Sequence, residues 1–296
     1  MISKVLAWTA VAALSLTQVS LSRSHRLCDG FVEENNMNIP VSALHAFGAT
    51  GGIDEATFNR VLDRVEKIYT PIIAAAGGKL NIVRNWTDGT VNAYAVQEGT
   101  DWQIQMFGGL ARHPVITEDA MAAVTCHEMG HHLGGAPKIP DPTSTWASNE
   151  GQADYFAALK CLRLYFDPAS NAQWMKETAA SIPQFAISKC TEVYSSENDK
   201  TVCLRTAMAT YSVGLLFQDL RQETVVPQFN TPDKSIVSVM DDNHPGTQCR
   251  VDTYFESALC NQPVSAALSN TDYSVGTCTQ AAGYKNGYRP RCWFKP

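Results

Sequence analysis

The clearest periodic pattern in the chain lies between residues 54 and 76, where apolar residues recur at every third or fourth position. Side chains with this spacing line one face of a helix, so the pattern predicts an amphipathic α-helix. Gly77 and Gly78 follow as its stop signal, and Pro71 is expected to kink or break it near Thr70. The apolar positions are Phe58, Val61, Leu62, Val65, Ile68 and Tyr69.

Three short segments rich in β-branched and aromatic residues come next. Residues 79–86 and 91–97 flank Asp88 and Gly89, a dipeptide typical of tight hairpin turns, so these two strands are expected to pair antiparallel. Residues 102–107 are expected to form a third strand. An edge strand of this sheet could hold an extended peptide by backbone hydrogen bonds, or the sheet could serve only to pack the fold.

Two helices are predicted on either side of a loop that contains prolines. The first begins after Thr117, a suitable N-cap, and continues to Leu133, where two glycines end it. The second covers residue 149 to about residue 166, with Ser148 as its cap and an Asp-Pro pair as its stop.

The rest of the chain completes a mainly α (α+β) pattern with a small antiparallel sheet. Residues 171–222 and 251–259 are expected to be largely helical, whereas residues 261–296 carry cysteines without a regular period. No repeat or low-complexity tract interrupts the chain. We therefore predict one main domain over residues 25–260, followed by a cysteine-bearing tail over residues 261–296.

Composition and charge narrow the class of protein. The 296 residues are 45% hydrophobic and 18% charged, which is ordinary for a globular protein, and the formal net charge is -6. Because no run of Lys or Arg is present, nucleic acid and anionic membrane surfaces are not expected as partners. The sequence predicts no particular oligomeric state.

The first residues have the pattern of a secretory signal. Lys4 precedes an apolar run over residues 5–16, which is shorter than the about 20 residues needed to cross a bilayer. We therefore expect residues 1–24 to be a signal peptide and the protein to be exported, either periplasmic or secreted. The cleavage position stays open between residues 20–22 and 15–17, and a retained signal anchor is the alternative.

The chain has nine cysteines, which in an exported protein are mostly paired. Cys126 is expected to be the unpaired thiol, because it directly precedes a candidate metal ligand on a helix that should be buried. Proximity along the chain favours the pairs Cys190 with Cys203, Cys249 with Cys260, and Cys278 with Cys292.

Residues 127–131 read His-Glu-Met-Gly-His within a predicted helix. Two histidines four positions apart lie about 40° from one another around the axis and roughly 6 Å along it, so His127 and His131 can bind one metal ion. Glu128 lies about 100° round from His127, outside the ligand set but close to a water on the metal. The pattern predicts one catalytic zinc ion per chain, with Glu128 as general base. A structural zinc site with a fourth protein ligand is the alternative.

A second acidic pair follows in the next predicted helix, where Glu150 and Asp154 share a face. We expect Glu150 to be the third zinc ligand and Asp154 to accept the free N–H of a ligating imidazole. The alternative for Glu150 is a solvated acid, favoured by the helix dipole in the first turn. His132 is expected to face solvent or to bond locally rather than to bind the metal.

The order of motifs around these residues resembles the gluzincin peptidases that include the CAAX prenyl protease and the heat-shock membrane protease. The resemblance covers about residues 54–260 and implies a zincin-like helical metallopeptidase domain. It also implies that His244 lies near the cleft, where it contacts the transition state or covers the metal. The transmembrane helices of the best-known members have no counterpart here, so soluble exported relatives are the nearer comparison. The similar elements are Asn92-Ala93-Tyr94-Ala95, Gly108-Gly109-Leu110, the acidic-capped helix from Thr117, Glu150-Gly151-Gln152-Ala153-Asp154, and His244-Pro245 with Arg250.

Together these patterns predict an exported, zinc-dependent endopeptidase that hydrolyses a polypeptide substrate. Two alternatives stay open. One is a non-catalytic, chaperone-like binding protein that retains zinc but whose cleft is blocked, with His244 as a fourth ligand. The other is a zinc hydrolase that acts on non-peptide amides.

Overall fold

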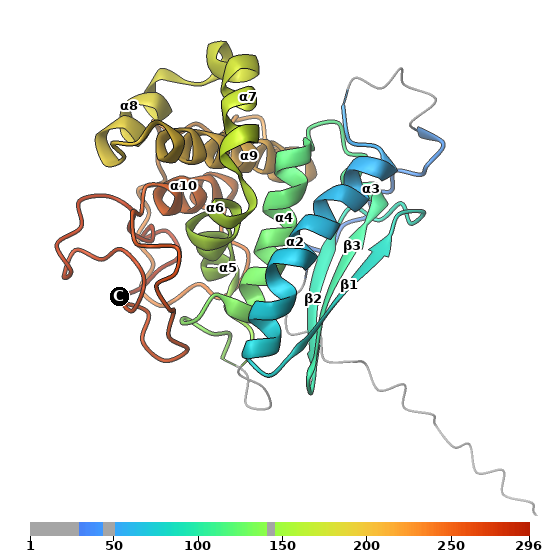
Figure 1. The fold of residues 1–296 in the computed structure, drawn as a ribbon, viewed down its shortest axis with the longest axis horizontal. Coiled ribbons are helices and arrows are strands. Elements are labelled where there is room, and N and C mark those ends of the chain that lie inside the picture. The colour runs from blue at the N-terminus through green and yellow to red at the C-terminus, as the bar shows by residue number, and fades with distance from the viewer. Residues whose placement is uncertain (1–29, 44–50, 141–145) are drawn as a thin grey trace, which may run out of the picture.

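The computed structural model describes residues 30–43, 51–140 and 146–296. The predicted signal peptide over residues 1–24 and Cys28 lie outside these residues. The described part is mainly helical with one small sheet, which confirms the predicted α+β class (Figure 1). Within these ranges, no helix combines the length and the apolar character needed to span a membrane.

Helix α2, Glu55–Ala75, confirms the predicted amphipathic helix. Asp54 caps it by accepting a hydrogen bond from an amide of the first turn. The periodic apolar side chains of the helix are buried next to the sheet, except for Ile68, which is partly buried. The expected break at Pro71 is wrong, because the helix continues through this residue. Tyr69 and Ile73 are buried on either side of Pro71, and this packing offsets the one backbone hydrogen bond that a proline removes.

The sheet has three strands, and the last of them lies in the middle. β3, Asp101–Phe107, pairs parallel with β1, Lys79–Asn85, and antiparallel with β2, Ala93–Glu98. All three predicted strands are therefore present, but the predicted antiparallel pairing of the first two is wrong. A tight turn at Gly99 joins β2 to β3 instead.

Arg112 explains why the chain does not turn back at Asp88. Its guanidinium donates hydrogen bonds to the carbonyls of Trp86 and Asp88 at 2.7 and 2.9 Å. The Asp88 side chain accepts the Thr90 amide in a local turn, and Trp86 packs its ring against Phe58 of α2. These contacts are distant in the sequence, so the turn signal alone does not reveal that the chain crosses to the far edge of the sheet.

Helix α4, Glu118–Leu133, runs between the sheet with α2 on one side and the remaining helices on the other (Figure 1). Thr117 caps it as predicted, by accepting the Ala120 amide at 3.1 Å. Every residue from Asp119 to His132 is buried. A helix buried on all sides positions its side chains rigidly, which suits it to carry a site.

The second predicted helix begins where the sequence indicates but is built from three pieces. Its cap is Asn149, which accepts the Gln152 amide at 3.0 Å, and not Ser148. The Ser148 hydroxyl is engaged instead as a donor to the Gly135 carbonyl at 2.7 Å. The pieces are α5, Glu150–Phe156, a π-helical turn, Ala157–Cys161, and α6, Leu162–Tyr165.

Helix α9, Glu197–Leu220, packs against α4, and α10, Thr247–Ala258, packs against α5. Helices α7, Pro168–Thr178, and α8, Gln184–Val193, pack against α9, and the C-terminal tail lies beside α10 (Figure 1). Residues 261–296 contain no helix or strand, as predicted. The remaining helical elements are α3, Gly108–Ala111, and a short 3-10 turn, Ala179–Ser181.

Four disulfides join cysteines of the described residues, and they fit an oxidising compartment. Of the three predicted pairs one is confirmed, and the prediction of a free thiol at Cys126 is wrong. The pairing of Cys249 with Cys260 fails because α10 keeps them about 16 Å apart, whereas disulfide Cα atoms lie within about 7 Å. The observed pairs are Cys126–Cys161, Cys190–Cys203, Cys249–Cys292 and Cys260–Cys278.

Candidate metal centre

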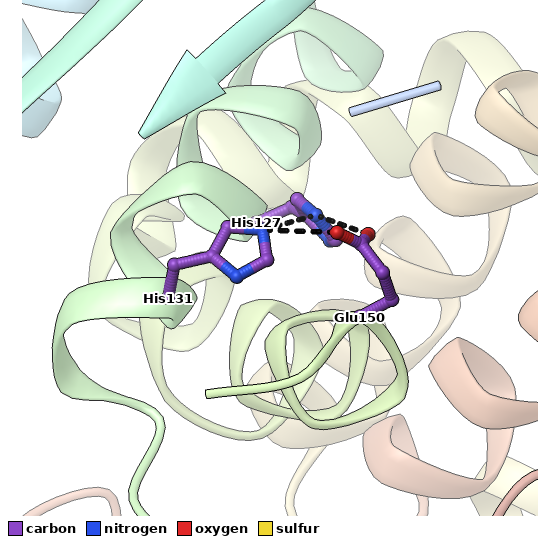
Figure 2. A group of neighbouring side chains, drawn as sticks. All are labelled: His127, His131 and Glu150. Carbon is purple, nitrogen blue, oxygen red and sulfur yellow. Dashed lines mark hydrogen bonds and ion pairs between the residues drawn. The ribbon is translucent and has the colours of Figure 1, made fainter. Parts of the chain in front are cut away.

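His127, His131 and Glu150 bring their side chains together between α4 and α5 (Figure 2). The Nε2 atoms of the two histidines are 3.1 Å apart, and they lie 3.2 and 3.5 Å from the two carboxylate oxygens of Glu150. At most 3% of any of these side chains is exposed. The group could hold one metal ion, with each residue offering one ligand atom.

The short loop between the helices allows Glu150 to reach this group. The loop ends against the end of α4, where the Ser148 amide donates to the His131 carbonyl at 2.9 Å. At Gly130 the two helices are so close that a Cβ atom would lie 2.8 Å from the Ala153 backbone. Because glycine has no Cβ, α5 can approach α4 closely enough for Glu150 to meet both histidines.

Hydrogen bonds to the other ring nitrogens fix the orientation of both histidines. His127 Nδ1 lies 2.7 Å from Asp154 Oδ1, and His131 Nδ1 lies 2.8 Å from the Ser148 carbonyl oxygen. A carboxylate and a carbonyl only accept hydrogen bonds, so both Nδ1 atoms carry a proton. The lone pairs of the Nε2 atoms then point toward one another and toward Glu150.

Such converging lone pairs repel one another unless a positive charge lies among them. Burial lowers the pKa of His131 to about 4, so this imidazole is neutral at pH 7. Burial would also lower the pKa of His127, but the carboxylates of Asp154 and Glu150 outweigh it and raise that pKa to about 9. A proton on His127 can supply the positive charge, and so can a divalent ion, which binds deprotonated imidazole and carboxylate.

Glu128 is fully buried on α4, next to His127 in the sequence. Neither of its carboxylate oxygens has a hydrogen-bond partner among the described residues. Burial raises the pKa of Glu128 to about 8. Leaving a buried polar group unsatisfied costs about 1–3 kcal/mol, so packing does not explain the presence of this carboxyl.

Asp154 connects His127 to Arg250 of α10, as the sequence predicts for a supporting carboxylate. The guanidinium donates to both Asp154 oxygens at 2.8 Å, and the two side chains are at most 1% exposed. Burial would raise the pKa of Asp154, but Arg250 and His127 lower it further than burial raises it. Asp154 is therefore ionised and holds His127 in one orientation.

His244 reaches the centre from the loop before α10. Its Nε2 atom lies 3.5 Å from the Glu150 carboxylate and 2.7 Å from the Gly30 carbonyl oxygen. Since a carbonyl only accepts, the proton of this imidazole is on Nε2. His244 thus lies beside the centre, as predicted, without being one of the three side chains that converge on the metal position.

His132 is buried, so the predicted exposure to solvent is wrong. Its ring is stacked between Trp102 and Trp146, with centroids 5.4 and 4.8 Å away. Its hydrogen-bond partner is not local in the sequence either, because Nε2 lies 3.2 Å from the Gln103 carbonyl oxygen of β3. Burial lowers the pKa of His132 to about 3, which makes it a neutral packing residue next to the centre.

Sequence reasoning missed Phe31, whose ring packs edge-on against His127 with a centroid distance of 4.9 Å. Phe31 is fully buried, and the Arg250 guanidinium lies over its ring, 5.1 Å from the centroid. The surrounding residues carry no period and no motif, because the segment is held by contacts with β2 and α10 that are distant in the sequence.

Comparisons of the chain with protein-family models, curated proteins and solved structures found no match. The functional argument therefore rests on the residues of the centre.

Proposed function

We propose that the protein is a zinc-dependent endopeptidase. The observation that carries this proposal is a buried group of two imidazoles and one carboxylate beside a second carboxylate that has no hydrogen-bond partner among the described residues. A tetrahedral zinc ion with bonds of about 2.0–2.1 Å places its ligand atoms about 3.3 Å apart. The three separations of 3.1, 3.2 and 3.5 Å agree with that value.

Each residue around the group has one role in peptide hydrolysis. When bound, zinc supplies a Lewis acid and lowers the pKa of a water. Glu128 takes the proton of the attacking water and passes it to the leaving amine. Asp154 keeps the proton of His127 on Nδ1, so that Nε2 stays free as a ligand. His244 donates a hydrogen bond to the oxygen on which negative charge develops.

The neighbouring sheet supports a polypeptide substrate. β2 is an edge strand, and α4 packs against it. The Ala93 carbonyl is directed away from β3, since it accepts the Phe31 amide. An extended peptide can add to such an edge by main-chain hydrogen bonds, whatever its side chains. The four disulfides agree with an exported enzyme, and export to the periplasm or medium belongs to this proposal.

The gluzincin resemblance is part of the same proposal. Its elements are scattered along the sequence, yet His127, Glu150, His244 and Arg250 come from three different parts of the chain to one centre. Motifs that matched only by chance would have no reason to meet in space.

Substitution of Glu128 tests the reaction directly. Glu128→Gln should keep one zinc per chain by metal analysis, and should slow hydrolysis of a fluorescently labelled unfolded casein by about 10²–10⁴-fold. Glu118→Gln, which changes an exposed acid on the same helix, is the matched control and should behave as wild type. Equal turnover in Glu128→Gln and wild type would refute the assignment.

A zinc-retaining binding protein is the second candidate, and the burial of the whole group favours it. In that case His244 would close the fourth coordination position. The absorption spectrum of the Co²⁺-substituted protein separates the two, because it reports the ligand number. For the peptidase, His244→Ala leaves the spectrum unchanged and slows hydrolysis, whereas for the binding protein it alters the spectrum and no hydrolysis is found. A screen of small amides tests the remaining hydrolase alternative.

A further inference from the structure

The first described residues of the chain lie against the metal centre, between β2 and α10. The Phe31 amide donates to the Ala93 carbonyl at 2.9 Å, and Arg250 donates to the Phe31 carbonyl at 2.8 Å. The Asn92 side chain accepts the Val32 amide at 3.1 Å and donates to the Val32 carbonyl at 3.0 Å. The main-chain groups of both residues are thus held, independently of their side chains.

The preceding carbonyl, that of Gly30, contacts His244 beside the centre. His244 Nε2 donates to it at 2.7 Å, and the same nitrogen is 3.5 Å from the Glu150 carboxylate. Gly30 has φ of +97°, and a Cβ atom there would lie 2.7 Å from both the Asn92 Oδ1 and the Tyr94 ring. Both the backbone conformation and the lack of space therefore require glycine at this position.

The side chain of Phe31 closes the centre from this side. Its ring packs against His127 and, at a centroid distance of 5.3 Å, against Phe217 of α9. Phe31, His127 and Glu128 are all fully buried. A polypeptide of ordinary size therefore cannot reach the centre while Phe31 occupies this position.

These contacts match what a peptidase needs from its substrate. Sequence-tolerant recognition uses the N–H and C=O groups that all peptides share. Hydrolysis also requires one carbonyl beside the metal, with a hydrogen-bond donor directed at its oxygen. Residues 30–32 provide both features. His244 donates to the Gly30 carbonyl, and the Ala93 carbonyl and the Asn92 side chain bind the main chain of Phe31 and Val32.

We infer that residues 30–32 occupy the position of a substrate main chain and keep the centre closed as an internal competitor. The inference rests on the proposed peptidase function. A polypeptide substrate must displace this segment and then makes the same contacts with Ala93, Asn92 and His244. Along β2 the main-chain groups alternate in direction, so Ala95 points to the same edge as Ala93 and continues the track.

Replacement of Gly30 opens the centre without touching a ligand. Gly30→Ala introduces a Cβ atom against Asn92 and Tyr94 in a left-handed backbone conformation. Gly77→Ala is the matched control, because Gly77 has φ of +88° but no atom within 4 Å of the added Cβ. The two variants share the backbone strain and differ in the displacement of residues 30–32.

The primary measurement is the rate at which a chelator removes Zn²⁺ from the full chain, which does not depend on activity. Gly30→Ala should lose zinc at least about tenfold faster than Gly77→Ala, a change of about 1.4 kcal/mol in the opening free energy. It should also hydrolyse labelled casein faster. Equal rates of zinc loss in the two variants would overturn the inference.

The two proposals can fail separately. If the peptidase proposal is wrong, no variant hydrolyses casein, while the difference in zinc loss remains. If the internal competitor is wrong, zinc loss is equal in both variants, whatever the hydrolysis assay gives.

A second measurement does not depend on whether Gly30→Ala folds. In Glu128→Gln, saturating unfolded casein should speed hydrogen exchange of the Phe31 and Val32 amides at least about tenfold. Unchanged exchange with casein bound would also overturn the inference.

Discussion

Asp154 is the residue on which the buried charges of the centre depend, so Asp154→Asn is the sharpest test of its electrostatics. Asp154 Oδ1 accepts from both His127 Nδ1 and Arg250, and Oδ2 accepts from Arg250. An asparagine has the same shape but only one accepting oxygen. Whichever way the amide turns, its NH₂ group faces an N–H donor of Arg250 or His127, and the guanidinium charge loses its partner.

The cost follows from the burial of these groups. The Asp154 and Arg250 side chains are 0% and 1% exposed, so solvent does not screen the lost pair. Removing one partner of a buried ion pair costs about 3–5 kcal/mol. At about 2–4 °C per kcal/mol for a domain of similar size, Tm should fall by about 6–20 °C. Because His127 also loses its orientation, zinc affinity should fall about 10–100-fold.

Thermal unfolding of the chelator-treated protein measures the first effect, and competitive zinc titration measures the second. The pKa of Asp154 is lowered by folding, so its stabilisation is present above its unfolded pKa of about 3.9 and is lost as pH falls below that value. The difference in Tm between wild type and variant should therefore shrink only in acid. The double variant Asp154→Leu with Arg250→Met should recover stability but not zinc affinity. A fall in Tm below about 2 °C at pH 7 with unchanged zinc affinity would refute the reasoning.

Three further predictions concern stability and are checked by unfolding experiments. Burial raises the pKa of Asp252 to about 6, above the unfolded value of about 3.9, so stability falls as pH rises between these values. Asp252→Asn should therefore be about 1 kcal/mol more stable than wild type at pH 8 in denaturant titrations, and the gain should vanish near pH 4. Gly151→Ala would place a Cβ atom 2.3 Å from the Trp293 ring and should destabilise by about 1–3 kcal/mol; an unchanged Tm would contradict this close contact. Replacing Cys126 and Cys161 together by alanine removes a cross-link over 35 residues and should cost about 4 kcal/mol, whereas an equal Tm would contradict the pairing.

The part of the centre that the sequence predicts best is the part determined by one helix. His127, His131 and Glu128 lie within a single turn and a half, so their relative directions follow from the helix period alone. Glu150 also follows a local rule, because Asn149 starts α5 and places the next residue in its first turn. Its distance from the histidines depends in addition on Gly130, whose role in the helix contact is visible only in the structure.

The wrong sequence-based predictions concern features that are determined by contacts between residues distant in the sequence. The Asp-Gly turn signal is real, but Arg112 binds the carbonyls of Trp86 and Asp88 and directs the chain elsewhere. Pairing cysteines by proximity ignores α10, which keeps Cys249 away from Cys260. Residues 30–32 escape notice for the same reason, since their main-chain contacts with Asn92 and Arg250 follow no pattern in their own side chains.

His244 has a different role in each of the two candidate functions, and its contact with residues 30–32 controls which role it can take. Its Nε2 proton is committed to the Gly30 carbonyl, so His244 cannot donate a lone pair to the metal from that nitrogen while the contact lasts. Displacing residues 30–32 frees it for one of two roles. In a peptidase it turns to the carbonyl oxygen of the entering substrate, and in a binding protein it moves onto the ion. Gly30→Ala removes this contact, so its Co²⁺ spectrum repeats the test made with His244→Ala in an opened centre. An unchanged ligand number with faster hydrolysis favours the peptidase, and an added nitrogen ligand without hydrolysis favours the binding protein.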